Sequence, residues 1–249
     1  MRVAAIYDIH GNLPALEAVL EDIGRAGVDR IVVGGDIVPG PMPGRTLAAV
    51  LEMEGPTCFI RGNGEREILA LLAGNDPSEA VPAALHDTLR WVVADLAPGH
   101  ARRMGEWPTT LRVGVPGIGE VLFCHATPRS DSELFTRLTA EERLRPIFEP
   151  AGTPLVVCGH THMPFDRTIG SVRVVNAGSV GMPFGEPGAD WLLLGPDVEL
   201  RHTAYDLEAA AARIRATDYP GASEFAERNV LRPPSAAEML ELYERAALR

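Results

Sequence analysis

The sequence contains no lysine and no glutamine, so all 23 of its basic residues are arginines. The absence of lysine excludes a Schiff-base nucleophile and a lysine-bearing phosphate loop. The net charge of −11 argues against broad binding to nucleic acid or to an anionic membrane. A phosphate substrate stays compatible with this charge, because bound cations can reverse the local field.

Long apolar runs and paired cysteine motifs are also missing. No run approaches the roughly 18 residues of a membrane span, and strand-like sequence begins at residue 2, so we expect neither a membrane partner nor a signal peptide. Cys58, Cys124 and Cys158 lie in apolar strand-like runs, and no C-x-x-C pair is present. An odd number of cysteines in such runs predicts reduced, buried thiols in a cytoplasmic protein.

Short apolar runs alternate with amphipathic segments in the first part of the chain. The runs at 2–7, 31–33 and 57–60 predict buried strands. Two helices are expected between them, one with Asn12 as its N-cap and Gly27 at its end, and one over about 45–54. This alternation predicts parallel strands joined by right-handed crossovers.

The rest of the chain changes pattern twice. Residues 65–106 carry helical sequence divided by prolines, which indicates an insertion or cap, and residues 206–249 read as a helical extension. Capping boxes predict helix starts at Thr139 and Ser235. The 46% hydrophobic content is ample for a core, and we expect a single domain over 1–249. Further strands are predicted at 109–115, 119–124 and 155–158, in a hairpin turning at Gly170-Ser171, and at 191–194 and 198–205.

Side chains with metal-binding atoms follow five of the predicted strands. Taken singly, Asp8 and Asp36 read as turn or cap residues, Asn63 as a turn residue and His125 as a core histidine. His160 and His162 form the sharpest cluster, because two histidines after a glycine and a buried strand are rarely structural. The full ordered set is Asp8, His10, Asp36, Asn63, His125, His160 and His162. Together these residues predict parallel strands that deliver oxygen and imidazole ligands to one sheet edge, where two divalent cations would suit phosphoester hydrolysis.

The order D-x-H, G-D, G-N, H, G-H-x-H resembles the calcineurin-like metallophosphoesterase superfamily over about residues 1–180. The short chain and the GHTH form look like its small bacterial and archaeal phosphodiesterase branch. The resemblance implies an α/β fold, a four-layer α/β/β/α sandwich with a dinuclear metal centre at strand ends. It also implies a ligand set: Asp8, His10 and His162 for the first metal, Asn63, His125 and His160 for the second, and Asp36 as the bridge.

Two local sequences depart from the family pattern. Asn176-Ala177-Gly178-Ser179 resembles an N-P-G-S turn with alanine in place of proline. Many relatives carry a histidine after the metal-binding asparagine, and that histidine assists the leaving group. Here the position is Gly64, followed by the acidic Glu65. The usual general acid is therefore absent, and no catalytic residue is assigned beyond the metal ligands.

The resemblance implies a cytoplasmic phosphoester hydrolase, with a phosphodiesterase favoured, that uses a metal-activated hydroxide. Mn, Fe, Ni, Zn or Co could occupy the two sites, and activity should fall in acid because ligating imidazoles must be neutral. The expected substrate is a phosphoester small molecule or a nucleotide. Arg66 and Arg129 are candidates for binding its phosphate, and an ordinary surface arginine is an equal alternative for each. The sequence gives no indication of oligomeric state.

Other functions remain as alternatives at this stage. A nucleotide or protein phosphomonoesterase is the nearest one, followed by a catalytically weak metal-binding scaffold of the same fold. Such a scaffold would be marked by missing ligands, and none of the seven is missing. A metallo-β-lactamase type of hydrolase would need an H-x-H-x-D-H run, which the chain lacks.

Overall fold

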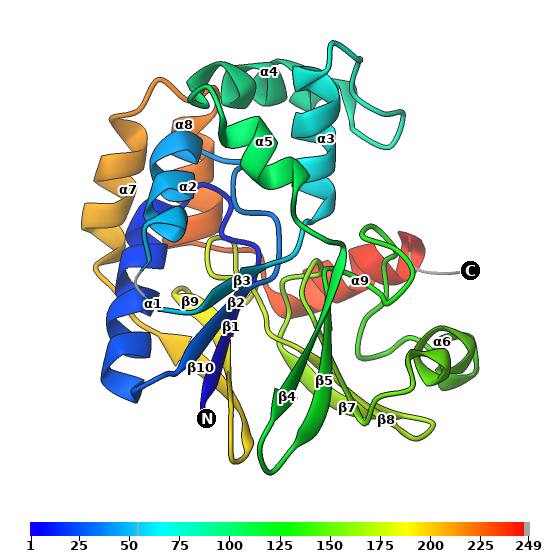
Figure 1. Cartoon of the computed structure of the whole chain (residues 1–249). Coiled ribbons are helices and arrows are strands. Elements are labelled where there is room, and N and C mark those ends of the chain that lie inside the picture. Colours follow the sequence, from blue (N-terminus) through cyan, green and yellow to red (C-terminus); the bar gives the residue numbers. More distant parts are fainter. Residues whose placement is uncertain (54, 247–249) are drawn as a thin grey trace.

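The computed structural model describes residues 1–53 and 55–246. Residue 54, the last of the predicted 45–54 helix, and residues 247–249 of the predicted extension lie outside the described residues. Two five-stranded mixed sheets face each other, with helices on both outer faces (Figure 1). The predicted four-layer α/β/β/α sandwich is confirmed.

The first sheet has the strand order β10-β9-β1-β2-β3. As predicted, the three N-terminal strands are parallel, while β9 and β10 run antiparallel to their neighbours. The strands are β1 (Val3–Ile6), β2 (Arg30–Val33), β3 (Thr57–Phe59), β9 (Ala189–Leu194) and β10 (Val198–Thr203).

The second sheet has the order β4-β5-β6-β8-β7. β5, β6 and β8 are parallel, and the two edge strands are antiparallel to their neighbours. The central strands of the two sheets are therefore β1 and β6. The strands are β4 (Thr110–Val115), β5 (Gly119–Cys124), β6 (Leu155–Cys158), β7 (Phe165–Ile169) and β8 (Val172–Asn176).

Three hydrophobic clusters separate the layers. Alternation along β1 sends Val3 and Ala5 into the cluster between the sheets, and Ala4 and Ile6 into the cluster under the helices. A third cluster joins the outer face of the second sheet to its covering helix. Tyr7, fully buried between the sheets, donates a hydrogen bond from its hydroxyl to the Val157 carbonyl at 3.2 Å. The two central strands are thus linked directly.

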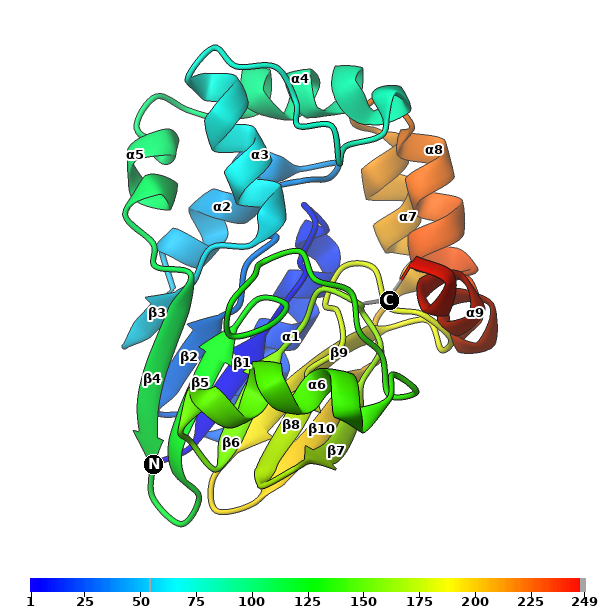
Figure 2. The ribbon, with the colours of Figure 1, turned by 90° about the vertical axis from the view of Figure 1, so that its right-hand side faces the viewer.

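The helices are distributed unevenly around the sandwich (Figure 2). The first sheet is covered by α1 (Leu13–Ala26), α2 (Pro43–Leu51) and α7 (Leu207–Arg215), and the second by α6 (Glu141–Phe148) with a 3₁₀ turn (Glu149–Ala151). The predicted 65–106 region contains α3 (Asn63–Leu72), a 3₁₀ turn (Ala83–Leu85), α4 (His86–Asp95) and α5 (His100–Gly105). The C-terminal helices are α8 (Ala222–Phe225), a π-helical segment (Ala226–Leu231) and α9 (Ala236–Ala246).

The predicted helix caps had mixed outcomes. Asn12 accepts a hydrogen bond from the Ala15 backbone N–H, and Gly27 ends α1 in a left-handed conformation, so both predictions are confirmed. Ser235 and Glu238 form the predicted capping box. The box predicted at Thr139 was wrong. α6 begins after Ala140, and the Thr139 hydroxyl instead bonds the Thr136 N–H and the Glu244 carboxylate.

Candidate metal centre

The predicted ligands come from the ends of strands in both sheets. The expectation of one sheet edge was wrong, because β1, β2 and β3 belong to one sheet and β5 and β6 to the other. The two edges nevertheless meet: the His160 N–H donates to Asp8 Oδ2 at 2.7 Å, and His125 Nδ1 lies 2.9 Å from the Gly34 carbonyl oxygen. Close approach requires glycine here. A Cβ on Gly159 would lie 2.5 Å from Asp8 Oδ2.

Asp8 is fully buried, and its two carboxylate oxygens have different environments. Oδ2 accepts the hydrogen bond from the His160 backbone, which fixes the orientation of the group. Oδ1 has no hydrogen-bond partner among the described residues. It lies 3.5 Å from His162 Nε2 and 3.7 Å from His125 Nε2. A buried, unpaired anionic oxygen facing imidazoles is the environment that a bound cation would satisfy.

Asp36 repeats this arrangement from the adjacent strand. Its Oδ1 accepts a hydrogen bond from the Gly64 N–H at 2.7 Å, at the start of α3. Its Oδ2 lies 3.9 Å from His10 Nε2 and 3.6 Å from His125 Nε2. Each carboxylate is therefore fixed by one backbone donor and directs its other oxygen at the same group of imidazoles.

Three of the imidazoles are held by backbone carbonyls. His10 Nδ1 lies 3.0 Å from the Pro39 oxygen and His162 Nδ1 lies 2.9 Å from the Met182 oxygen, as His125 Nδ1 does from Gly34. A carbonyl only accepts, so Nδ1 carries the proton and Nε2 presents its lone pair to the centre. His10 Nε2 and His162 Nε2 are only 3.2 Å apart. Two facing lone pairs at that distance need a cation or a proton between them.

These donors fit divalent cations. Ligand atoms within 4.8 Å of one another define two groups: Asp8, His10 and His162, and Asp8, Asp36 and His125. The first group is the predicted first-metal set. Near the second, Asn63 Oδ1 lies 3.1 Å from His125 Nε2, and the buried His160 Nε2 has no partner among the described residues. Asp8 belongs to both groups, so the assignment of Asp36 as the bridge stays a prediction.

Backbone strain is concentrated on the same residues. In the described part of the chain, the non-glycine residues with positive φ are Asp8, His10, Asp36, His160 and His162. Left-handed conformations of such residues cost on the order of 1–3 kcal/mol each and persist where the surroundings over-determine them. All five are predicted metal ligands.

The electrostatics favour the ligating form of Asp8, His10 and His160, but not of His125. Burial alone would raise the pKa of Asp8, but the neighbouring His162 and His125 hold it well below its usual range. Burial and the adjacent His125 lower the pKa of His160 to about 4, and burial with His162 lowers that of His10. Burial opposes protonation of His125, but the Asp36 and Asp8 carboxylates leave its pKa raised.

Glu65 has a structural role that the sequence reasoning missed. Its fully buried carboxylate accepts hydrogen bonds from the backbone N–H groups of Ile37 at 2.6 Å, Asp36 at 2.7 Å and Gly62 at 3.0 Å. Burial, with the charge of Asp36, raises its pKa to about 7. Glu65 thereby fixes the loop that carries Asp36 against the loop that carries Asn63.

The 176–179 turn braces the centre from the other side. Asn176 donates to the Gly159 carbonyl at 2.6 Å and to Thr161 Oγ1 at 3.1 Å. Ser179 Oγ donates to the Asp8 carbonyl at 2.7 Å. Both side chains are fully buried. The N-A-G-S sequence signalled this turn, but only the structure shows that it holds both ligand-bearing loops.

The two arginines predicted to bind phosphate already have acidic partners. Arg66 pairs with Asp131 and lies 3.3 Å from a Glu67 oxygen, and Arg129 pairs with Glu133 at 2.6 Å. Both guanidinium groups are partly exposed. Binding of substrate phosphate by either one stays a prediction and would require an exchange of partners.

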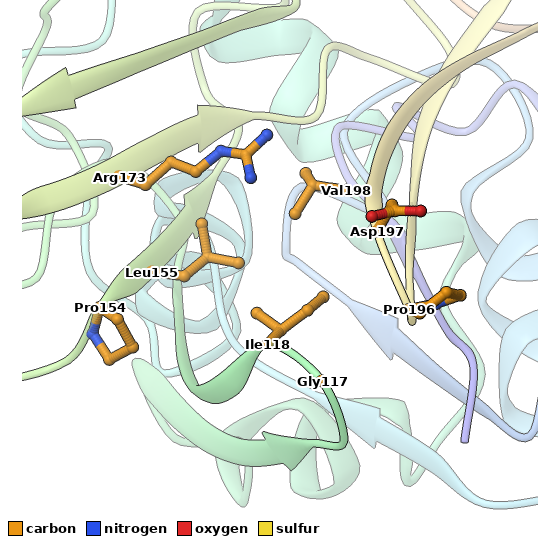
Figure 3. A pocket seen from close by; sticks show the side chains of 8 residues that line it. All are labelled: Gly117, Ile118, Pro154, Leu155, Arg173, Pro196, Asp197 and Val198. Carbon is orange, nitrogen blue, oxygen red and sulfur yellow. The ribbon is translucent and has the colours of Figure 1, made fainter.

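The hollow with a defined volume and the predicted metal ligands lie at different ends of the sandwich. A hollow of about 440 Å³ lies near the amino ends of β6 and β8 and the β4–β5 and β9–β10 turns, opposite the metal ligands (Figure 3). Ile118, Pro154 and Val198 line it, together with Arg173 and Asp197. It contains none of the predicted ligands, so we place the candidate site at the carboxyl ends of the strands.

Residues 1–195 match the family model of the calcineurin-like phosphoesterase superfamily domain. The chain belongs to this family. The predicted family resemblance is confirmed, and the family normally uses divalent metals. The Asp and His groups described above are the residues that could hold them here.

Relatives of known name extend over most of the chain. It is 26% identical to the phosphodiesterase YfcE of Escherichia coli over 80% of this chain and 89% of that protein. It is 25% identical to the uncharacterized protein MJ0912 of Methanocaldococcus jannaschii, with 85% and 91% covered. A metallophosphoesterase structure from Sphaerobacter thermophilus matches with a TM-score of 0.71 and 26% identity, covering 92% of this chain and 99% of that one.

Membrane-spanning helices and cysteine pairing bear on where in the cell the protein is found. Across residues 1–53 and 55–246, no helix combines the length and apolarity needed to cross a bilayer. All three cysteines are free. Cys124 and Cys158 are buried as predicted, whereas Cys58 on the edge strand β3 is only half-buried.

Proposed function

We propose that the protein is a metal-dependent phosphodiesterase. The observation that carries this proposal is the facing arrangement of two buried carboxylates and the imidazoles, with Asp8 Oδ1 and His160 Nε2 unpaired at the described centre. Two divalent cations would lower the pKa of an attacking water and neutralise charge on the phosphoryl group. Asp8, His10 and His162 would hold one cation. Asn63, His125 and His160 would hold the other, with Asp36 between them.

The protein's own residues would organise the reaction around those ions. The carbonyls of Pro39, Gly34 and Met182 keep three imidazoles in the tautomer that ligates. The backbone donors from His160 and Gly64 aim the carboxylates. The substrate's phosphorus would lie at the centre with the attacking oxygen in line with the leaving group, an arrangement that a preorganised, largely buried site favours.

The choice of a diester is supported by the similarity to a phosphodiesterase, whereas Gly64 bears on the leaving group. A Cβ at this position would lie 2.4 Å from Pro39 Cγ and 2.9 Å from Asp36 Oδ1, so the local packing disfavours any side chain. A positioned acid typically contributes about 10²–10⁴-fold. Without one here, we expect preference for activated leaving groups such as aryl esters.

Substrate access is the second part of the proposal. α3 starts at the predicted ligand Asn63 and carries Arg66, which pairs with Asp131 in the loop that follows His125. We propose that the α3–α5 region overhangs the centre and shapes the entrance. The cytoplasm remains the proposed compartment, consistent with three free cysteines.

The test is a panel of phosphodiesters and phosphomonoesters with matched leaving groups, assayed with Mn, Fe, Ni, Zn and Co. Higher kcat/KM for diesters would support the proposal, and higher values for monoesters would establish the phosphomonoesterase alternative instead. A leaving-group series then addresses Gly64. A steep fall in rate with rising leaving-group pKa is expected, whereas a flat dependence would show that another group supplies the proton.

A further inference from the structure

Helix α9 lies beyond the residues that match the family domain, yet it reaches the metal centre. The family match ends at residue 195, and α9 spans Ala236–Ala246. In Figure 2 this helix lies beside the loop that follows β8. The contacts of Tyr243 and Glu244 show how it is attached.

An aromatic series connects α9 to a predicted ligand. The Phe184 ring stacks on the His162 imidazole, with centroids 5.3 Å apart and planes inclined by 19°. Tyr243 meets Phe184 edge-on, at 6.2 Å and 64°. Both Phe184 and Tyr243 are half-buried. The two rings therefore extend the metal centre outward from His162 as an apolar surface, which we call the aromatic wall.

The position of α9 is fixed at both sides of the centre. Glu244 accepts hydrogen bonds from the hydroxyls of Thr136 at 2.6 Å and Thr139 at 3.3 Å, in the segment between His125 and α6. On the other side, the Gly185 N–H donates to the Pro234 carbonyl at 2.9 Å, just before α9. The helix thus joins the segment that follows β5 to the loop that follows β8, and both strands belong to the second sheet.

The environment of Tyr243 keeps its side chain uncharged. Burial, with a smaller effect of the Asp8 carboxylate, raises the pKa of its hydroxyl to about 12. The phenol is therefore neutral at physiological pH, and does not repel a phosphate ester. A rigid, uncharged pair of rings suits a planar aromatic group, which can stack or meet ring edges.

We propose that Phe184 and Tyr243 form a specificity wall that binds the aromatic group of the substrate, so that the preferred substrates are aryl or heteroaromatic phosphoesters. This inference rests on the proposed function, because it assigns the organic part of the ester whose phosphorus lies at the metal centre. It makes α9 a part of the active site that the family domain alone does not supply.

Binding of two phosphonates tests the wall without involving any leaving group. Dissociation constants of phenylphosphonate and methylphosphonate are measured by calorimetry on the metal-loaded protein. We expect the phenyl compound to bind more tightly, and Tyr243→Ala to reduce that preference about five- to tenfold, in the range of one stacking contact. Methylphosphonate affinity and metal content should stay within about twofold of wild type.

Matched variants separate the ring from other effects. Leu242→Ala changes the adjacent residue, whose exposure is 54%, and should leave the preference unchanged. Tyr243→Phe should retain the preference, because the ring remains, and Phe184→Leu should lose it. Two results would overturn the proposed role of the aromatic wall. One is an equal loss of affinity for both phosphonates in Tyr243→Ala. The other is a loss of phenyl preference in Tyr243→Phe as large as in Tyr243→Ala.

The same measurements distinguish this inference from the proposed function. If the loaded protein hydrolyses diesters but shows no phenyl preference, only the wall is wrong. If the phenyl preference depends on Tyr243 while no ester is hydrolysed under any metal, the wall stands as a binding surface and the proposed function fails.

Discussion

The two ends of the β sandwich differ in whether their polar side chains have partners. At the carboxyl ends of the strands, Asp8 Oδ1 and His160 Nε2 are buried and without partners among the described residues. At the opposite end, beside the hollow, Arg173 is paired with Asp166 at 2.5 Å, and both are partly exposed. The hollow has a volume of about 440 Å³ but its ion pair is already satisfied, whereas the ligand end has unpaired buried donors and acceptors. This difference is the reason that we place the candidate site at the ligand end.

The backbone shows the same contrast. Turns next to the hollow place glycine at their positive-φ positions, such as Gly117 at 90° and Gly195 at 98°. The ligand end places aspartate and histidine in that conformation instead. A glycine would relieve the strain but would supply no donor atom. Strain is therefore retained where a side chain is needed in one fixed direction.

Removing a carboxylate from the ligand end should have the largest effect. We expect Asp8→Ala and Asp36→Ala each to lower kcat/KM on the order of 10³-fold, because a bound cation contributes several kcal/mol to the transition state. The measurement is steady-state hydrolysis of an aryl phosphodiester. Asp166→Ala, which removes a carboxylate near the hollow, is the control and should change activity less than about twofold. Equal effects at the two ends would break the comparison.

Glu65→Gln should have the next largest effect, because both carboxylate oxygens accept from backbone N–H groups and the glutamine NH2 group cannot accept. A buried donor left without its acceptor costs about 1–3 kcal/mol, so we expect the free energy of unfolding to fall by about 2 kcal/mol. Metal affinity should fall about 10–100-fold through the displaced Asp36 loop. Urea unfolding and metal titration measure these changes, with the exposed Glu120→Gln as control. An unchanged metal affinity would show that Glu65 does not position the ligands.

A carboxylate–imidazole pair outside the centre gives a pH test. His202 Nδ1 lies 2.8 Å from Asp190 Oδ1, and Nε2 lies 3.3 Å from the Pro187 carbonyl, so both ring nitrogens are occupied. The hydrogen bond that His202 donates to the Asp190 carboxylate raises the pKa of His202. The stability from this shift is fully present below the ordinary histidine pKa and is lost as pH rises through the raised folded value.

His202→Ala should therefore destabilise the protein more at pH 6 than at pH 9, and it should leave the metal content unchanged. Thermal unfolding at both pH values, with metal analysis, checks this. A larger loss at pH 9, or a loss of metal, would contradict the assignment of His202 as a satisfied structural histidine.

The smallest effect is expected at the hollow itself. Arg173→Ala removes a partly exposed pair, and such pairs contribute about 0–1 kcal/mol. Activity should stay within about twofold and the free energy of unfolding within about 1 kcal/mol of wild type. A large drop in activity would mean that the hollow takes part in the reaction.

The sequence could predict the candidate ligands because each follows a strand that its short apolar run identifies. Asp8 and His10 after β1, and His160 and His162 after β6, needed no knowledge of distant contacts. The meeting of two sheets at one centre was not predicted, since pairing between strands depends on long-range contacts, and the strand ends alone suggested a single edge. The Thr139 cap was wrong because that hydroxyl bonds Glu244, a residue 105 positions away.

Two other contributions had no local signal. The sequence identified Glu65 only as an acidic residue next to Gly64. Its role could not be predicted, because its backbone partners lie up to 29 residues earlier in the chain. The contact of Tyr243 with Phe184 depends on where a helix beyond the family domain docks. Ligands can thus be inferred from strand ends, whereas the groups that position them and select the substrate depend on tertiary packing.

Metal stoichiometry after reconstitution tests the central claim most directly. The metal-free protein is loaded with Mn, dialysed and analysed for bound metal per chain, beside Asp8→Ala and Asp166→Ala. We predict about two ions in the wild type and in Asp166→Ala, as expected of a two-metal centre, and a marked loss in Asp8→Ala, whose Oδ1 belongs to both ligand groups. Undiminished metal binding by Asp8→Ala, or binding lost equally in Asp166→Ala, would contradict a metal centre at the carboxyl ends of the strands.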